Sequence, residues 1–285
     1  MTRGKVRDGI RGIILLMKTR FLSVVAFVVA LSPLSASSAD RPAALKVLMV
    51  CGGCCHDYTV QKRLISEGVT KRINVAFTVR HDDAKEAATR EHKASVYSSA
   101  DWAKGYDLVV HSECYGAVKE TDLLERITAP HRAGLPAVFL HCSMHSYRMS
   151  EAADQWRELI GVKSTSHEKY RPLTVRVLQG THPVMRGFPE GWITPKGDEL
   201  YKVEKFHDSA TALAKAYGED TKQDHPVVWV NQSGRIRSFS TTLGHGNEVV
   251  ETKEYLDLVA RGILWVSGKL KDDGTPVNGF GPENP

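Results

Sequence analysis

Strand-like and helix-like segments alternate along the first half of this chain, and the alternation restricts the fold more than any other feature. Residues 45–50 (LKVLMV) form an apolar run typical of a buried strand, and residues 58–70 have helical spacing. Further strand-like runs cover residues 74–80, 106–112 and 137–140, with a helical pattern at 119–133 between the last two. This alternation predicts an α/β fold with a mainly parallel sheet and helices on both faces.

A β-hairpin and a glycine-flanked histidine follow in the second half. Residues 227–230 (VVWV) are apolar, residues 231–234 are turn formers, and residues 235–241 resume in strand formers. Gly244-His245-Gly246 comes next, ahead of a helical pattern that ends near residue 266. Because glycine has no Cβ, backbone can approach a ligand closely on both sides of His245. The alternative is a tight turn whose middle residue is a histidine by chance.

Histidines and carboxylates gather where the predicted strands end. In parallel sheets of this type, ligands bind at the carboxyl ends of the strands, so residues that follow a strand are the candidates for a site. Taken singly, each histidine is better explained by an ordinary hydrogen bond or by exposure to solvent than by a role in a site. Together they indicate either proton transfer on a polar substrate or a divalent metal such as zinc. They are His56 and Asp57 after the first strand, His111, Glu113 and Cys114 after the third, His141, Cys142 and His145 after the fourth, and His245 after the hairpin.

Three sets of candidate residues follow from this placement. His141 and His145 stand four residues apart and could present two ring nitrogens to one ion if a helix begins there, which predicts a metal set of His56, His141 and His145. The predicted catalytic residues are His56, Glu113, His141 and His245. The predicted substrate-binding residues are Asp57, His145, Glu199, Tyr201, Gly244 and Gly246. For Glu199 a solvated turn with no contact to substrate is the alternative.

Two later segments depart from the alternation. Residues 163–204 interrupt it and predict an insertion that forms a lid over the candidate site. Residues 271–285 are rich in Gly, Pro and Asp and predict a flexible tail, which leaves residues 40–270 as the domain.

The first 39 residues have the pattern of a secretory signal peptide. Six basic residues precede or flank an apolar run at 21–31, and small residues follow at 36–39. We therefore expect a periplasmic or secreted protein with no stable membrane insertion after cleavage; an uncleaved membrane anchor is the alternative. Of 38 Lys and Arg and 33 Asp and Glu, residues 40–285 keep 32 of each, so no basic surface argues for a nucleic-acid partner.

Five cysteines in a chain expected to be exported leave at least one free or paired between molecules. Cys51-Gly-Gly-Cys54 has CxxC spacing, but a redox cysteine of that type opens a helix, whereas Cys51 ends a predicted buried strand. A structural disulfide or buried thiols are therefore favoured for Cys51 and Cys54. Gly52-Gly53 lacks GxGxxG spacing, so no nucleotide cofactor is predicted.

Several motifs in sequence order resemble the trehalose-utilisation (ThuA-like) family over residues 45–270. They are GGCCHDY at 52–58, FLHCSMHSYR at 139–148, WRELIG at 156–161, HPV at 182–184, DELY at 198–201, the segment 227–246, and RGILWVSGKL at 261–270. The resemblance implies the class I glutamine amidotransferase-like fold, a flavodoxin-like three-layer sandwich. It also implies a role on trehalose-like or oxidised (keto) sugars and glycosides.

The chain departs from the amidotransferases at their nucleophile. The position that the resemblance aligns with their catalytic cysteine is His141, and Cys142 comes one residue later. A cysteine-dependent glutamine amidotransferase is therefore not expected. Two hypotheses remain: a hydrolase or isomerase acting on a sugar derivative, and a module that binds a saccharide or a partner protein without turnover. The sequence does not indicate an oligomeric state.

Overall fold

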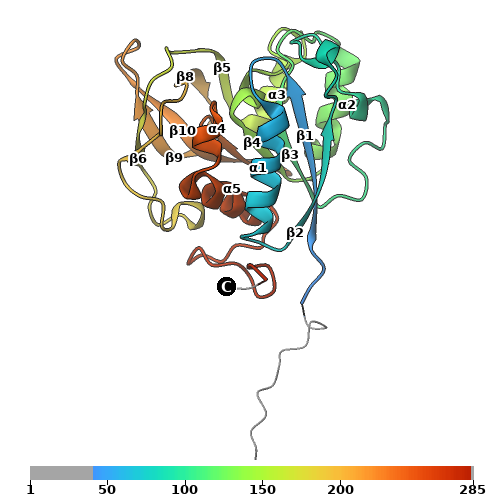
Figure 1. Cartoon of the computed structure of the whole chain (residues 1–285). Coiled ribbons are helices and arrows are strands. Elements are labelled where there is room, and N and C mark those ends of the chain that lie inside the picture. Colours follow the sequence, from blue (N-terminus) through green and yellow to red (C-terminus); the bar gives the residue numbers. More distant parts are fainter. Residues whose placement is uncertain (1–40, 284–285) are drawn as a thin grey trace, which may run out of the picture. The chain divides into compact units, whose positions relative to one another are not determined.

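The computed structural model describes residues 41–283, which form an α/β unit (Figure 1). The predicted signal peptide lies outside the described residues. No helix between residues 41 and 283 has the length and apolar character needed to cross a membrane.

Five parallel strands form the centre of a nine-stranded sheet, as the alternation of strands and helices predicts. Their order is β2-β1-β3-β4-β11, and each lies beside its neighbours in parallel register. The bounds are β1 Leu45–Gly53, β2 Val75–His81, β3 Leu108–Cys114, β4 Ala137–Leu140 and β11 Ile236–Thr241.

Antiparallel strands extend the sheet beyond β11. The predicted hairpin is confirmed, because β10 (Asp224–Ser233) pairs antiparallel with β11. The sheet continues through β9 (Ala210–Tyr217) and β6 (Thr174–Val177) to β7 (Trp192–Ile193). Two further strands, β5 (Val162–His167) and β8 (Tyr201–Phe206), pair in a separate two-stranded sheet.

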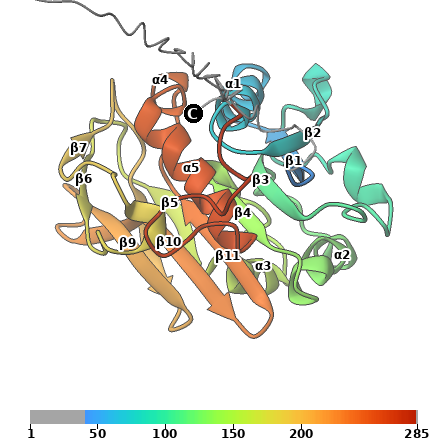
Figure 2. The ribbon, with the colours of Figure 1, turned by 90° about the horizontal axis from the view of Figure 1, so that it is seen from below.

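Helices cover both faces of the sheet and give the predicted three layers (Figures 1 and 2). On one face lie α1 (Tyr58–Thr70), the short α4 (Asn247–Val250) and α5 (Lys253–Val266). On the other lie α2 (Thr121–Arg132) and α3 (Ala153–Ile160). Short 3₁₀ turns stand at η2 Lys85–Ala87, η3 Ser95–Ser98, η4 His141–His145 and η5 Pro183–Met185.

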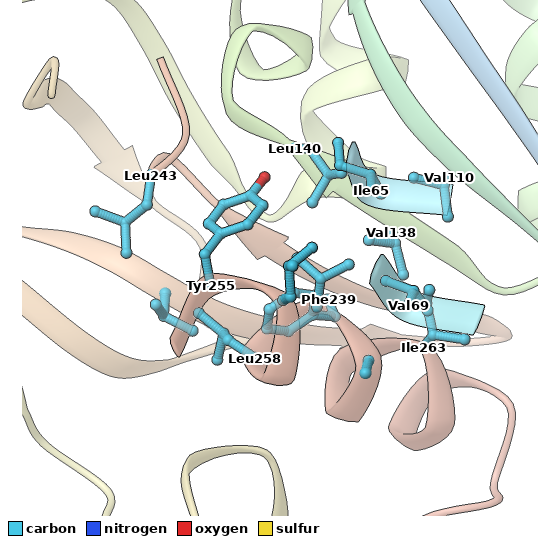
Figure 3. Close-up of a cluster of buried hydrophobic side chains, with 14 of the residues drawn as sticks. Ile65, Val69, Val110, Val138, Leu140, Phe239, Leu243, Tyr255, Leu258 and Ile263 are labelled. Carbon is cyan, nitrogen blue, oxygen red and sulfur yellow. The ribbon is translucent and has the colours of Figure 1, made fainter. Parts of the chain in front are cut away.

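Each layer of helices buries its own apolar core against the sheet. Figure 3 shows the core beneath α1 and α5, where Val138 and Phe239 from the sheet pack against Ile263 and Val69. A Cβ on Gly262 would overlap the Phe239 ring, so the absence of a side chain lets α5 lie close to the strand. Burial of these side chains, at about 25 cal/mol per Å² of apolar surface, holds the strands whose ends carry the candidate site.

Two predicted features differ in the structure. A lid over residues 163–204 is not confirmed, because the strands of this segment either extend the main sheet or pair as β5 and β8. The part of the tail up to residue 283 packs against the domain, contrary to the expectation of a flexible segment. Phe280 is buried, and the Asn74 N–H donates to the Phe280 carbonyl at 3.0 Å. The apolar Phe280 ring outweighs the loop-forming composition around it.

A chain of buried polar groups crosses the α2 side of the sheet. Nδ1 of His111 lies 3.0 Å from a carboxylate oxygen of Glu113, and its Nε2 lies 3.0 Å from Nε2 of His131. His131 in turn donates from Nδ1 to the Leu135 carbonyl at 2.8 Å. Burial, and then the neighbouring His111, lower the pKa of His131 to about 3.

This low pKa predicts acid sensitivity that depends on His131. In the unfolded chain His131 has a pKa of about 6.5, so as the pH falls it binds a proton in the unfolded state before it does so in the folded state. The free energy of unfolding therefore decreases as the pH falls from about 6.5 towards 3, and His131 causes no such loss above about 6.5. When the pH is lowered from 7 to 5, the free energy of unfolding should therefore fall in both proteins, but by about 2 kcal/mol less in His131→Phe than in the parent. Urea unfolding at the two pH values measures both losses. Equal losses in parent and variant would contradict the buried, neutral state of His131.

Candidate functional site

Three histidines from three different strand ends meet at the carboxyl edge of the parallel strands. His56 follows β1, His141 follows β4, and His245 lies between β11 and α4. Their ring centroids are 4.8 Å apart for His56 and His141, 4.8 Å for His56 and His245, and 5.4 Å for His141 and His245. One nitrogen from each ring lies within 4.8 Å of the other two. We refer to these three residues as the histidine cluster.

Backbone contacts orient two of these rings so that a free nitrogen faces the cluster. Nδ1 of His141 donates to the Thr242 carbonyl at 2.5 Å, and its buried Nε2 makes no hydrogen bond within the described part of the chain. Nδ1 of His56 lies 3.4 Å from the His245 carbonyl, which leaves its Nε2 for the cluster. His141 also has a left-handed backbone, with φ of +42°, at the sharp turn between β4 and η4. Such a conformation costs about 1–3 kcal/mol in a non-glycine residue and is typical of functional sites.

The loop that carries His245 is held by a buried carboxylate. Asp198 accepts hydrogen bonds from the backbone N–H groups of Gly244 at 2.8 Å, His245 at 3.1 Å and Glu199 at 2.9 Å. Burial raises the pKa of Asp198, while His141 and these three N–H groups act against the rise. Gly244 has φ of +107°, and a Cβ there would come within 2.8 Å of the Tyr255 hydroxyl, so this position suits glycine alone.

Glu199 joins the histidines into one charged group. Its carboxylate lies 3.2 Å from Nδ1 of His245, 3.5 Å from Nε2 of His141 and 3.5 Å from Nε2 of His167. Burial acts to raise the pKa of Glu199, but the adjacent histidines outweigh it and hold the pKa well below its usual range. Burial also acts against protonation of His245, and Glu199 and Asp198 outweigh it, so the pKa of His245 is raised.

His56 differs from His245 in the direction of its pKa shift. Burial, followed by the nearby His141 and His245, lowers the pKa of His56 to about 3. His56 is therefore neutral at neutral pH and offers a lone pair to a cation. Nδ1 of His245, although 3.2 Å from Glu199, is buried and makes no hydrogen bond of good geometry within residues 41–283. Two cluster nitrogens thus have the Glu199 carboxylate nearby but no hydrogen bond of good geometry.

A cavity of about 230 Å³ opens beside the cluster. His145 and Tyr201 stack face to face on its wall, with ring centroids 4.0 Å apart. His56 also borders a smaller space of about 10 Å³, lined by His141, which is close to the size that one water molecule needs. The arrangement gives a polar chamber with a stacked aromatic wall and a small inner compartment between imidazoles.

Some predicted site residues lie outside the histidine cluster. Nε2 of His145 contacts the Ser164 hydroxyl at 3.0 Å, so the structure groups His245, in place of His145, with His56 and His141. An α-helix, the condition for His141 and His145 to share an ion, does not begin here; the 3₁₀ turn η4 takes its place, and His145 contacts Ser164 of β5. Asp57 caps α1 by accepting from the Val60 N–H at 3.1 Å. With Gly246, Asp57 borders a groove on the outer side of His56.

Glu113 does not face the site. It belongs to β3, and like His111 it points to the α2 side, where the Tyr97 hydroxyl donates to it at 2.8 Å. Cys114, the next residue, points to the opposite side and lines the cavity. The structure therefore does not bring Glu113 to the histidine cluster with which it was predicted to act, because successive side chains along a strand point to opposite faces.

Four of the five cysteines lie around His56. Cys54 pairs with Cys55, Cys114 pairs with Cys142, and Cys51 is free. The expected pairing or shared burial of Cys51 and Cys54 is therefore not what the structure shows. Burial raises the pKa of the Cys51 thiol to about 12, so it is unreactive at neutral pH. Because Cys142 is in a disulfide and His141 occupies the sharp turn, the described site has no free thiol placed as a nucleophile.

These pairings predict the number of free thiols. Unfolding the protein without reductant should expose one thiol per chain, that of Cys51, and reduction should raise the number to five. A thiol-reactive chromophore measures both values. The Cys51→Ala variant should give none before reduction. Three or more thiols in freshly prepared, unreduced protein would contradict at least one of the two disulfides.

The site also contains residues that the sequence did not indicate. Thr242 and Gln61 orient the cluster through backbone contacts, with the Gln61 amide donating to the His245 carbonyl at 2.9 Å. Arg90 and Arg148 line the cavity. The two arginines lie outside regular strands and helices, and Gln61 is a polar residue on the buried face of α1. The periodicity of the sequence therefore does not indicate any of the three.

Comparison with known proteins places this chain in a family. A model of the family described as "ThuA: Trehalose utilisation" matches residues 46–266. No curated protein matches the chain.

Solved structures show the same fold. The chain is similar to a ThuA-like protein from Parabacteroides merdae, with a TM-score of 0.63 and 17% identity over 84% of this chain and 98% of that one. It is also similar to a ThuA-like protein from Bacteroides uniformis, with a TM-score of 0.59 and 15% identity over 83% and 96%. A β-galactosidase from Bacillus circulans shares the fold over 80% of this chain and 32% of its own, with a TM-score of 0.52 and 12% identity. Identities this low show the fold alone.

Proposed function

Because this chain belongs to the ThuA family of trehalose utilisation, we propose that it is an enzyme that hydrolyses or isomerises a sugar derivative, either trehalose-like or a keto-glycoside. The observation that supports this most is the histidine cluster, in which the buried Nε2 of His141 and Nδ1 of His245 make no hydrogen bond of good geometry in residues 41–283, although the Glu199 carboxylate lies 3.5 Å and 3.2 Å from them. Buried polar atoms are nearly always well satisfied, so two imperfectly satisfied nitrogens in one cluster support a bound group.

A divalent cation such as zinc fits this donor set. His56, His141 and His245 would each supply one nitrogen, as in catalytic zinc sites with three protein ligands and an open fourth position. Neutral imidazole is the form that binds metal, and the low pKa of His56 keeps that ring neutral. When bound, the cation would polarise a sugar oxygen or activate water.

Glu199 is the group best placed to move a proton. It lies next to His141 and His245 on one side and the partly exposed His167 on the other, and it lines the cavity where the sugar would sit. Its carboxylate is ionised and can accept a proton from water or from a sugar carbon or hydroxyl. His167, at the mouth side, can exchange that proton with solvent. This division of roles serves hydrolysis and isomerisation alike.

The cavity supplies the means of holding a sugar ring. Tyr201 and His145 stack on each other in its wall, and the aromatic groups that line the cavity there could contact the C–H face of a pyranose. We further propose export to the periplasm or outside the cell, on the basis of the basic and apolar pattern in residues 1–39.

The experiment that tests the enzyme replaces cluster histidines. His245→Gln and His141→Gln keep size and a hydrogen bond but remove a metal-binding nitrogen, so each should bind substoichiometric Zn²⁺ where the parent binds about one per chain. Turnover across a panel of trehalose-like sugars and keto-glycosides should fall about a hundredfold or more, with sugar affinity changed much less. Elemental analysis after dialysis against Zn²⁺ and an initial-rate assay measure the two effects.

His207→Gln is the matched control, because His207 lies between β8 and β9 and lines neither the cavity nor the inner space. It should keep parental zinc content and turnover. Unchanged turnover in both cluster variants would show that the reaction occurs elsewhere. Sugar binding without turnover in the zinc-loaded parent would instead favour a binding module.

A further inference from the structure

We propose that the substrate of this site is an acidic sugar, one whose ring carries a carboxylate or phosphate group that Arg148 and Arg90 bind. The inference rests on the proposed function for the site itself, and it adds the charge and the size of the substrate. It comes from two guanidinium groups on the cavity wall that have no counter-ion.

Arg148 is half-buried on this wall. Its Nη1 donates to the Thr165 carbonyl at 2.9 Å, and no carboxylate within residues 41–283 comes within ion-pair distance of it. One backbone contact uses one of five N–H donors, which leaves the remaining edge of the guanidinium for a ligand. A partly desolvated arginine without a partner is unfavourable unless an anion binds to it.

Arg90 approaches from a different part of the chain. It lies in the loop between β2 and β3, where its carbonyl accepts from the Ala117 N–H at 3.0 Å, and its side chain makes no ion pair with any described residue. Both side chains line the same cavity, and burial and then the charge of Arg90 lower the pKa of Arg148. The half-buried Arg148 and the exposed Arg90 line one wall without an ion pair in residues 41–283, and guanidinium groups can hold a carboxylate or phosphate in bidentate fashion.

The remaining lining groups do not cancel this charge. Among residues 41–283, Glu199 is the only carboxylate that lines the cavity, and His141, His167 and His245 already lie close to it. His145, between the two regions, is neutral, because burial and then Arg148 lower its pKa to about 2. The wall therefore has an excess of positive charge.

The volume restricts the ligand further. The cavity, at about 230 Å³, is smaller than the range of about 300–1,000 Å³ typical of sites for drug-sized ligands. We infer that the cavity holds one sugar unit with its acidic group, and that the second unit of a glycoside would lie outside it, towards the groove on the outer side of His56. The acidic group could be a carboxylate, as in a uronic acid, or a phosphate ester, and the chemistry that binds it is the same.

Calorimetric titration of the zinc-loaded, full-length protein tests the proposal. The probes are glucose, glucuronate, glucose 6-phosphate and inorganic phosphate. At least one of the two acidic sugars should bind tenfold or more tightly than glucose, and more tightly than inorganic phosphate. Whichever acid binds better identifies the acidic group. Its affinity should fall on raising the salt concentration, since the contact is between charges.

Arg148→Gln should weaken the acidic sugar tenfold or more and leave glucose within about twofold, and Arg90→Gln should have the same effect to a smaller degree. Arg235→Gln, at the exposed β10–β11 turn, removes the same charge away from the cavity and should change neither affinity. Equal affinities for glucose and both acids, no binding of either acid at millimolar concentration, or equal losses for acid and glucose in Arg148→Gln would overturn the proposal. Inorganic phosphate binding as tightly as the sugar phosphate would also overturn it, because it would show a site for a free ion.

The binding test separates this inference from the proposed function. Tight, Arg148-dependent binding of an acidic sugar supports the inference even if no sugar is turned over. Turnover of neutral sugars that depends on His245 and is unaffected by Arg148→Gln supports the enzyme and overturns the acidic substrate.

Discussion

The geometry of the site depends on one buried carboxylate. Asp198 accepts hydrogen bonds from the N–H groups of Gly244, His245 and Glu199. It thereby fixes the segment that carries the His245 imidazole relative to the segment that carries the Glu199 carboxylate. Without it, three N–H groups would be left unpaired or would need water, at about 1–3 kcal/mol for each that stays buried. Asp198 binds no substrate in the arrangement proposed here; it places His245 against Glu199 and thereby sets the distances within the cluster.

The parallel sheet brings the other two histidines to the same place. His56 and His141 follow β1 and β4, which lie on either side of β3, and His245 follows β11 beside β4. Because all four strands run in one direction, their final residues must share an edge. The left-handed backbone of His141 then turns its ring towards the other two. In the family resemblance this turn corresponds to the position of a catalytic cysteine, so the same backbone feature here presents an imidazole.

The sequence predicted the fold well because the fold follows from local periodicity. α1 and β4 have the predicted bounds, and β2 and β3 differ from theirs by one or two residues. The sequence also placed His56, His141 and His245 at one edge, since that requires only the strand order and direction. It could not assign Glu113 to a face, because every residue of β3 is buried and the usual apolar and polar alternation is absent. Arg148 and Asp198 lie in irregular segments, and their roles depend on contacts between residues far apart in the chain.

Charge balance connects the metal site to the substrate. Asp198 and Glu199 place two carboxylates beside the cluster, and His56 is neutral at neutral pH. Protonation of His245 alone would compensate one of the two charges, whereas a divalent cation would compensate both while also binding the imperfectly satisfied nitrogens of His141 and His245. With the carboxylates neutralised in this way, the charges of Arg90 and Arg148 remain without compensation on the same wall. An acidic sugar would supply the missing negative charge. The site with its bound cation and the proposed substrate together therefore come closer to electrical neutrality than either does alone.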